Sequence, residues 1–428
     1  MTRNEKQDVN RRVKRHSLFI RADWPVKLLL VLIFIAGAIL VWNSRDALRA
    51  AGENDIVSPI MKMALDNCMA AYLLLGGTVL VILAVYPFDK KFAQDQLQSI
   101  GLVNHTGAVP VLIRKHRDPD NHRVTIWEFR SPSIPLVAWE NKRPDIEAAL
   151  DINIVQMSYT RGKSRVLLHT VPAQTDLPAL LEWKNEYLSQ TDFELVMGES
   201  FLGPVTVNLA NIPHILLGGS TGSGKSVLLK LLLMQAIQKG ADVYIADFKG
   251  GVDFIAFQDK GCQICTKEQE LLAVLTDLEN ELERRKELFL QAKSSSLSQY
   301  NRVRDAKLKR CIFACDEVAE VTGRNRPTKE LKELAIQIES KLETIARLGR
   351  AFGIHLILST QRPDAVILSG QIRNNLDCRV CGRADNNLSQ IILDNTDAAN
   401  LIPKNSKGRF LLHDRTLFQG YLIDEDNL

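Results

Sequence analysis

Eight consecutive residues have the types and the spacing of a phosphate-binding loop. They fit the pattern G-x-x-x-x-G-K-[ST] at every fixed position and comprise Gly219, Ser220, Thr221, Gly222, Ser223, Gly224, Lys225 and Ser226. A strand-like segment (Ile212 to Leu217) precedes the loop, and a helix-like segment (Val227 to Ile237) follows it. Glycines let backbone N–H groups converge on a phosphate, Lys225 neutralises the β- and γ-phosphates, and the Ser226 hydroxyl coordinates Mg²⁺. The loop therefore predicts a bound nucleoside triphosphate with Mg²⁺.

An acidic pair follows a second strand-like segment. Asp316 and Glu317 come after Cys311 to Ala314 and are separated from it by Cys315 alone. A carboxylate at the carboxyl end of a strand can hold Mg²⁺ through water, and a neighbouring carboxylate can orient and deprotonate an attacking water. We assign Asp316 to the metal and Glu317 to the catalytic base. Without the phosphate loop, the same pair would be interpreted as the start of a helix.

Three further polar residues end apolar segments. Gln361, in HLILSTQRPD, is predicted to sense the γ-phosphate or to position water through hydrogen bonds, and the alternative is a polar cap at the end of a strand. Asp247 and Lys249, in VYIADFKGG, form either an outer pair that supports the site or a solvated turn. The sequence alone does not decide between these two interpretations.

The elements that must position these residues alternate along the chain. From Val205 onward, amphipathic helical patterns separate apolar segments, which are Ile212 to Leu217, Val243 to Ala246, Cys311 to Ala314, His355 to Ser359 and Arg379 to Gly382. Such alternation predicts an α/β domain (residues 204–428) in which helices cover both faces of a parallel sheet.

The preceding residues, 89–203, have a mixed pattern of shorter range. Strands are predicted at Val109 to Ile113, Val124 to Phe129 and Arg165 to His169, and helices at Asp145 to Leu150 and Ala179 to Leu188. This pattern predicts a small α+β domain without a recognisable chemical motif.

The N-terminal residues have the features of a membrane anchor. Two uncharged apolar segments, at about residues 26–42 and 68–88, predict a transmembrane hairpin (28–88). The tail (1–27) has eight Lys or Arg against three acidic residues, and Lys90 with Lys91 follows the second segment. By the positive-inside rule, both termini and the α/β domain are expected on the cytoplasmic side of the cell membrane. The alternative is a cleaved signal peptide followed by a buried helix.

Composition excludes several classes of protein. The chain has 428 residues, of which 46% are hydrophobic and 24% charged, and this excludes collagen-like, low-complexity and wholly disordered chains. Seven cysteines, spread through apolar segments, predict reduced thiols in a cytoplasmic compartment. The pairs Cys262 with Cys265 and Cys378 with Cys381 lie in strand-like segments, where residues three apart point to opposite faces and cannot readily share one metal ion.

From about Val205 to about Asp424, the sequence resembles the motor domain of the FtsK/SpoIIIE family of membrane-anchored translocase ATPases. The resemblance is carried by the strand that ends at Asp247 and by the segments PHILLGGSTGSGKSVLLK, CTKEQELLAVLTDLENELERRKELF, CDEVAEV and ARLGRAFGIHLILSTQRPDAV. It implies a RecA-like sheet, ATP as the nucleotide, assembly into a homo-hexamer, and movement of a polymer through a central pore.

The resemblance also implies roles for three arginines. Arg350, in RLGRAFGIH, matches the position from which related coupling ATPases reach the γ-phosphate of a neighbouring subunit, and Arg383 is a second candidate for this finger in trans. For both residues, the alternative is an ordinary ion pair at the surface or at an interface. Arg373 lies where family members place pore loops, and it is the predicted DNA contact.

The layout of the chain favours one branch of this family. It has two predicted spans, no long linker, and no DNA-reading module after the last strand-like segment, Arg409 to Ile423. This layout resembles the coupling ATPases of conjugative plasmids and integrative elements, which deliver relaxase-bound DNA to a membrane channel. A DNA pump for conjugation is therefore the preferred hypothesis. The alternatives are a DNA translocase of the chromosome-partition type, a type VII-like motor for protein export, and a membrane scaffold regulated by nucleotide.

Overall fold

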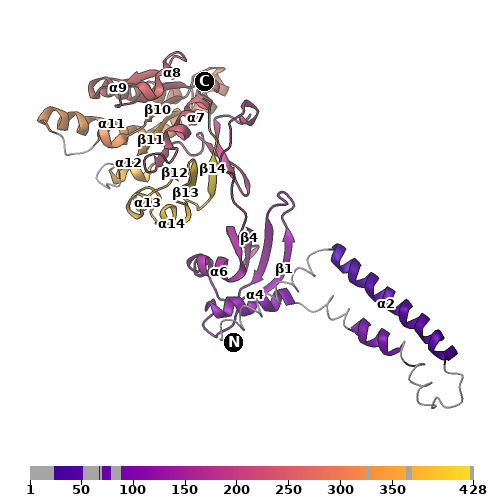
Figure 1. The fold of residues 1–428 in the computed structure, drawn as a ribbon. Helices are drawn as coiled ribbons and strands as arrows, with labels where there is room; N and C mark the ends of the chain where they lie inside the picture. The colour runs from indigo at the N-terminus through magenta and orange to yellow at the C-terminus, as the bar shows by residue number, and fades with distance from the viewer. Residues whose placement is uncertain are drawn as a thin grey trace. The chain divides into compact units, whose positions relative to one another are not determined.

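The computed structural model describes residues 24–51, 67, 70–78, 88–322, 327–362 and 369–424. These residues divide into two units. Figure 1 shows them as a ribbon coloured by residue number, from indigo at the N-terminus to yellow at the C-terminus. The smaller unit contains the described residues up to Lys115 together with Trp127–Asp151 and Ser158–Leu167. The larger unit contains His116–Ile126, Ile152–Met157 and the described residues from Leu168 onward.

The first sheet has the strand order β1-β2-β4-β3, and it is formed by β1 (Val111–Arg117), β2 (Thr125–Arg130), β3 (Ile152–Thr160) and β4 (Gly162–Pro172). The helices of this part of the chain are α4 (Phe88–Ser99), α5 (Leu136–Asn141) and α6 (Arg143–Leu150). The rings of Phe129 and Trp139 are buried with centroids 5.2 Å apart. Strands and helices together form the α+β architecture that the sequence pattern predicts.

The first predicted span lies within α2 (Trp24–Ala51). Most of the second predicted span lies outside the described residues, but its residues 70–78 are described and are helical. The rings of Phe34 and Tyr72 stack at 5.2 Å. Two glycines leave room for these rings, because a Cβ on Gly37 would lie 2.2 Å from the Tyr72 hydroxyl and one on Gly76 would lie 2.3 Å from the Phe34 ring. Among the described helices, none combines the length and the hydropathy expected of a bilayer-spanning helix.

The second sheet contains ten strands in the order β6-β5-β14-β13-β12-β7-β11-β10-β8-β9. The strands from β12 to β9 in this order are parallel neighbours. Their residue ranges are β12 (Cys378–Cys381), β7 (Ile215–Gly218), β11 (Ile354–Thr360), β10 (Cys311–Cys315), β8 (Asp242–Ala246) and β9 (Gln263–Cys265). The parallel sheet predicted from the alternating pattern is therefore confirmed.

Antiparallel strands extend this sheet at the β12 side. They are β13 (Arg409–Leu412), β14 (Leu417–Gly420), β5 (Glu194–Ser200) and β6 (Gly203–Asn208). The single strand-like segment predicted at Arg409 to Ile423 is thus a hairpin of two strands. The predicted domain boundary after residue 203 is displaced as well, because β5 precedes it and belongs to this sheet.

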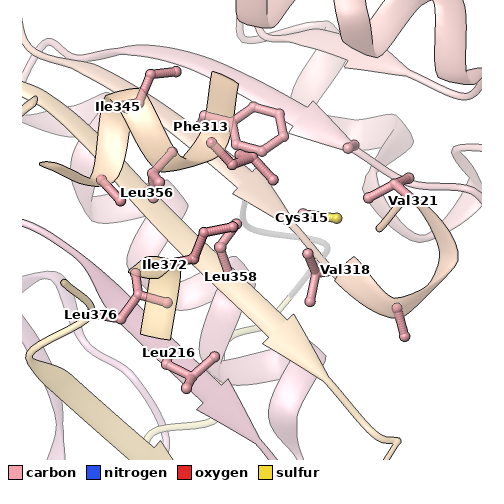
Figure 2. Packing of buried hydrophobic residues seen from close by; sticks show 14 of the residues in the cluster. Leu216, Phe313, Cys315, Val318, Val321, Ile345, Leu356, Leu358, Ile372 and Leu376 are labelled. Atoms are coloured by element: carbon pink, nitrogen blue, oxygen red, sulfur yellow. The ribbon is translucent and has the colours of Figure 1, made fainter. Parts of the chain in front are cut away.

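Helices cover both faces of the second sheet, and alternate residues of each central strand face opposite cores. Phe313 of β10 packs in one core with residues of α9 and α11, whereas Ile312 packs in the other core with residues of α7. Figure 2 shows Phe313, Leu356 and Leu358 together in the first core. The longer helices are α7 (Lys225–Gln238), α9 (Glu268–Gln291), α10 (Leu297–Arg304), α11 (Lys329–Phe352) and α13 (Asn386–Leu393). The shorter ones are α8 (Ile255–Gln258), α12 (Gly370–Asn374) and α14 (Asp397–Leu401).

The helix predicted at Ala179 to Leu188 is wrong, since only the 3-10 turn η1 (Asn185–Tyr187) forms there. The backbone instead pairs with the C-terminal segment: Trp183 N–H donates to Leu422 O at 2.8 Å, and Leu422 N–H donates to Leu181 O at 2.6 Å. The Trp183 ring contacts the Tyr421 ring edge to face. Tertiary contacts thus provide the burial that the apolar residues of this segment would otherwise gain in a helix.

The six described cysteines, Cys262, Cys265, Cys311, Cys315, Cys378 and Cys381, are free and buried. Burial raises the pKa of Cys265 to about 11 and that of Cys381 to about 12. Cys378 and Cys381 belong to opposite cores of the sheet, as do Cys262 and Cys265. The prediction that neither C-x-x-C pair binds one metal between its two sulfurs is consistent with this arrangement.

Candidate functional site

The register of the parallel strands places the predicted site residues at one edge of the sheet. Cys315 of β10 pairs with Ala246 of β8 and with Leu358 of β11, so that Asp247, Asp316 and Ser359 follow at the same level. Thr360 of β11 pairs in turn with Gly218, the last residue of β7. Because the carboxyl ends of parallel strands meet at one edge, residues far apart in the chain converge beside the phosphate loop.

The phosphate loop joins β7 directly to α7, which begins at Lys225. Gly224 has φ +98°, and a Cβ at this position would lie 3.0 Å from the backbone of Gly408. Gly408 N–H donates to Ser223 O at 2.8 Å. Glycine is therefore required at position 224 for two reasons. Its backbone is left-handed, and the segment before β13 approaches it too closely for a side chain.

Lys225 lies buried at the centre of the site. Its ammonium donates to Asp316 O at 2.7 Å, to Asp316 Oδ1 at 3.2 Å and to Ser359 Oγ at 2.6 Å. Three acceptors use all three N–H donors of a lysine. These acceptors satisfy the ammonium and hold it next to the predicted metal ligand.

Asp316 accepts hydrogen bonds from three different side chains. Besides Lys225, the Ser226 hydroxyl donates to Oδ1 at 2.9 Å, and the Lys249 ammonium donates to Oδ2 at 2.8 Å. Burial raises the pKa of Asp316, but the two ammonium groups and the hydroxyl outweigh it, so the pKa lies below its usual range. Asp316 is therefore an ionised carboxylate at neutral pH, as a metal site requires.

The site residues fit a hydrated Mg²⁺. The Ser226 hydroxyl and the Asp316 carboxylate are hydrogen-bonded to each other, so both are within reach of the same ion and its waters. Asp247 is 1% exposed, and its Oδ2 is buried with no hydrogen-bond partner in the described part of the chain. Oxygen ligands and retained waters are what Mg²⁺ prefers, and the unpartnered oxygen of Asp247 can accept from such a water.

Glu317 is held by the end of β11. Its Oε1 accepts from the Thr360 hydroxyl at 2.8 Å, and its Oε2 accepts from Gln361 N–H at 2.9 Å. The side chain of Gln361 in turn accepts from the Thr221 hydroxyl of the phosphate loop at 2.7 Å. The predicted base and the predicted sensor are thus linked to each other and to the loop.

The three arginines lie in different places. Arg383 is next to its own phosphate loop, where its guanidinium donates to Thr221 O at 2.7 Å and to Lys404 O at 2.8 Å. Arg350 is exposed in the last turn of α11, just before β11 begins at the opposite edge of the sheet. Arg373 is half-buried in the last turn of α12, and residues 363–368, where the predicted pore loop begins, lie outside the described residues.

The position of Arg350 excludes a contact with its own nucleotide. The seven residues of β11 separate it from Glu317 and Thr360, a length of about 20 Å at about 3.3 Å per residue. The turn is fixed, because a Cβ on Gly349 would lie 2.2 Å from Ile354 O. An arginine side chain is shorter than the length of β11, so Arg350 is not placed to reach the nucleotide of its own chain, whereas Arg383 contacts its own loop.

Sequence reasoning missed Thr360 and Ser359 and left Lys249 undecided. Thr360 and Ser359 read as ordinary residues of a buried strand, and their roles depend on the register between β10 and β11. The D-x-K spacing of Asp247 and Lys249 was the available signal, because Asp247 Oδ1 accepts from Lys249 N–H at 3.0 Å and so directs the lysine toward Asp316. Lys249 therefore contacts the site from an exposed turn, so each of the two interpretations is correct in part.

Thr360 is expected to act as a positioning residue for Glu317. Replacing it with valine removes one hydrogen bond to a carboxylate, and we expect kcat for ATP hydrolysis to fall about tenfold with little change in KM. Thr360→Ser should restore most of kcat. Steady-state kinetics of both variants test this, with Thr170→Val as the control for loss of a buried threonine hydroxyl elsewhere. Equal kcat in the Thr360→Val and Thr170→Val proteins would contradict the role.

Comparison with known proteins agrees with this geometry. The family model "FtsK/SpoIIIE family" matches residues 179–343. Relatives named "DNA translocase FtsK" from Helicobacter pylori and Staphylococcus aureus are 28% and 26% identical and align with 73% and 56% of this chain. The chain spans 37% and 32% of the lengths of these two relatives.

A solved structure covers more of the chain. The pCW3 conjugation coupling protein TcpA, in its monomer form with ATPγS, is 32% identical, and the match covers 79% of this chain and 96% of that chain with a TM-score of 0.59. This similarity confirms the predicted α/β fold of the RecA-like P-loop type. The family match and the structural relative lead to one conclusion: the chain belongs to the FtsK/SpoIIIE family of P-loop ATPases.

Proposed function

We propose that this protein is an ATP hydrolase that moves DNA, and that it serves as the coupling protein of a conjugative transfer system. The observation that carries the proposal is the convergence of Lys225, Asp316, Glu317 and Gln361 at one edge of the sheet. A scaffold that only binds nucleotide does not need a catalytic base, Glu317, hydrogen-bonded to a γ-phosphate sensor, Gln361. The structural match with a conjugation coupling protein covers 96% of that protein's chain. This match supports DNA as the cargo.

Hydrolysis at this site is divided among the residues as follows. The loop N–H groups and Lys225 hold the β- and γ-phosphates, and Ser226 and Asp316 hold Mg²⁺, directly or through water. When bound, Mg²⁺ neutralises phosphate charge and polarises the bond that breaks. Glu317 orients the attacking water and accepts its proton. Gln361 senses the γ-phosphate through its hydrogen bond with Thr221 of the phosphate loop.

We further propose that the protein works as a homo-hexamer anchored in the cell membrane by residues 28–88, with the ATPase unit in the cytoplasm. In this arrangement Arg350 completes the site of a neighbouring subunit, Arg373 contacts DNA, and a relaxase and channel components are the partners. The basic tail and the two apolar segments support the anchor. The name of the curated relatives, DNA translocase FtsK, supports chromosome-type translocation as the second candidate.

The test is ATP hydrolysis by the detergent-solubilised full-length protein, measured without nucleic acid, with single-stranded DNA and with double-stranded DNA. We expect DNA to stimulate hydrolysis and the stimulation to decline between about 50 mM and about 200 mM salt, because phosphate contacts release counterions. Lys225→Ala provides the blank. Preference for single strands favours conjugative coupling, and preference for duplex favours the chromosome-type reading.

Two other results would reject the DNA proposal. Hydrolysis well above the Lys225→Ala blank but indifferent to every DNA would shift the cargo to protein, as in type VII-like export. Nucleotide binding without hydrolysis above that blank would leave the nucleotide-regulated scaffold as the explanation.

A further inference from the structure

Lys249 places a second ammonium on the predicted metal ligand. It follows β8, and its Nζ lies 2.8 Å from Asp316 Oδ2, while Lys225 donates to Oδ1. Both carboxylate oxygens of Asp316 thus accept from ammonium groups.

The two lysines are held very differently. The Lys225 side chain is 4% exposed and has three acceptors, whereas the Lys249 side chain is 43% exposed. Lys249 also has a second carboxylate within reach, because Asp253 Oδ2 lies 3.7 Å from its Nζ. An exposed ammonium placed between two carboxylates loses little when it moves from one to the other.

The backbone next to Lys249 suits such a movement. Gly250 and Gly251 have φ +91° and +76°, and a Cβ at Gly250 would meet nothing within 4 Å. Two consecutive glycines in the left-handed region form a turn that other residues adopt only with strain. The ammonium can therefore leave Asp316 by rotation about its own side chain or at this turn, without displacing a packed core residue.

An Mg²⁺ ion and the Lys249 ammonium share one carboxylate. Ser226, the other residue expected to hold the ion, donates to Asp316 Oδ1, whereas Lys249 donates to Oδ2. An ion on the Oδ1 side and an ammonium on Oδ2 are like charges close together, and they repel each other. Movement of the Lys249 ammonium toward Asp253 relieves this repulsion.

We propose that Lys249 is a positioning residue that stands in for Mg²⁺ on Asp316 and is displaced to Asp253 when Mg²⁺ enters with the nucleotide. This inference rests on the proposed nucleotide site and adds a property to it. Lys249 lowers the affinity of the site for Mg²⁺ and so reduces the gain in nucleotide affinity that Mg²⁺ provides. It also keeps Asp316 neutralised between turnovers.

The test compares the affinity for a fluorescent ATP analogue in EDTA and in Mg²⁺, with no turnover measured. The ratio of interest is the dissociation constant in EDTA divided by that in Mg²⁺. In Lys249→Met, we expect this ratio to rise about tenfold, because the ammonium no longer repels Mg²⁺. Lys249→Arg keeps the charge and should keep the wild-type ratio. Lys260→Met, an exposed lysine of the same loop region, is the matched control.

The possible outcomes separate this inference from the proposed function. A ratio that is unchanged or lower in Lys249→Met would overturn the role, since a lower ratio means that Lys249 holds the phosphate together with Mg²⁺. Asp253→Asn removes the alternative partner and should lower the ratio, which provides a second test if the methionine variant folds poorly. Failure of the wild-type protein to bind the analogue in either buffer would instead reject the nucleotide site itself.

Discussion

Glu317→Gln is expected to lower ATP turnover by about two to four orders of magnitude, the range of general-base catalysis, while ATP binding stays intact. The amide cannot accept the proton of the attacking water. Its shape fits the pocket, because the amide oxygen can accept from Gln361 N–H and the amide nitrogen can donate to the Thr360 hydroxyl. The loss is therefore chemical and does not come from unfolding.

Two measurements check this prediction. Single-turnover hydrolysis gives the rate of the chemical step, and titration with a fluorescent ATP analogue gives the affinity. Lys225→Ala is the opposite control, since it should lose binding as well as turnover. Turnover by Glu317→Gln within a few fold of wild type would show that another group acts as the base.

Arg350→Ala is expected to reduce ATP turnover by about three orders of magnitude or more, the scale of an arginine finger, again with nucleotide binding retained. The reason is geometric: Arg350 is exposed at the edge of the sheet opposite to its own phosphate loop, so in the proposed hexamer we expect it to act on the site of a neighbour. The measurement is turnover in rings that mix Arg350→Ala subunits with Lys225→Ala subunits. We expect each variant to be inactive alone, and mixing to restore sites that combine an intact loop with an intact arginine.

The control for this experiment is Arg347→Ala, an exposed arginine one turn earlier on the same helix, which should keep turnover near wild type. Partial recovery that peaks near equal amounts of the two subunits would support action in trans. If no mixing ratio restored activity, Arg350 would be a structural residue. Arg383 is already engaged with its own loop through Thr221 O and is a weaker candidate for the same role.

The sequence predicted the centre of the larger unit well. Each of the five strand segments from Ile212 to Gly382 overlaps an observed strand, because parallel strands buried on both faces appear as continuous apolar runs. The phosphate loop and the Asp316–Glu317 pair were found for the same reason: each follows such a run. Their meeting at one edge follows from parallel topology and needs no knowledge of strand order.

The remaining contacts depend on order and register, which local patterns do not contain. Thr360 meets Glu317 only because β11 is the neighbour of β10, and Arg383 meets Thr221 only because β12 is the neighbour of β7. The segment Ala179 to Leu188 has apolar residues at helical spacing, yet its hydrogen bonds go to Leu422. In these places tertiary partners decided the structure.

The segment just before β13 connects the phosphate loop with the segment around Leu177. The Arg409 guanidinium donates to Leu177 O at 3.0 Å, and its neighbour Gly408 donates to Ser223 O of the phosphate loop. Segments at the edge of a fold usually open at a low free-energy cost. Local opening before β13 would release a contact of the loop, so we expect bound nucleotide, which stabilises the loop, to slow amide hydrogen exchange at Gly408 as well.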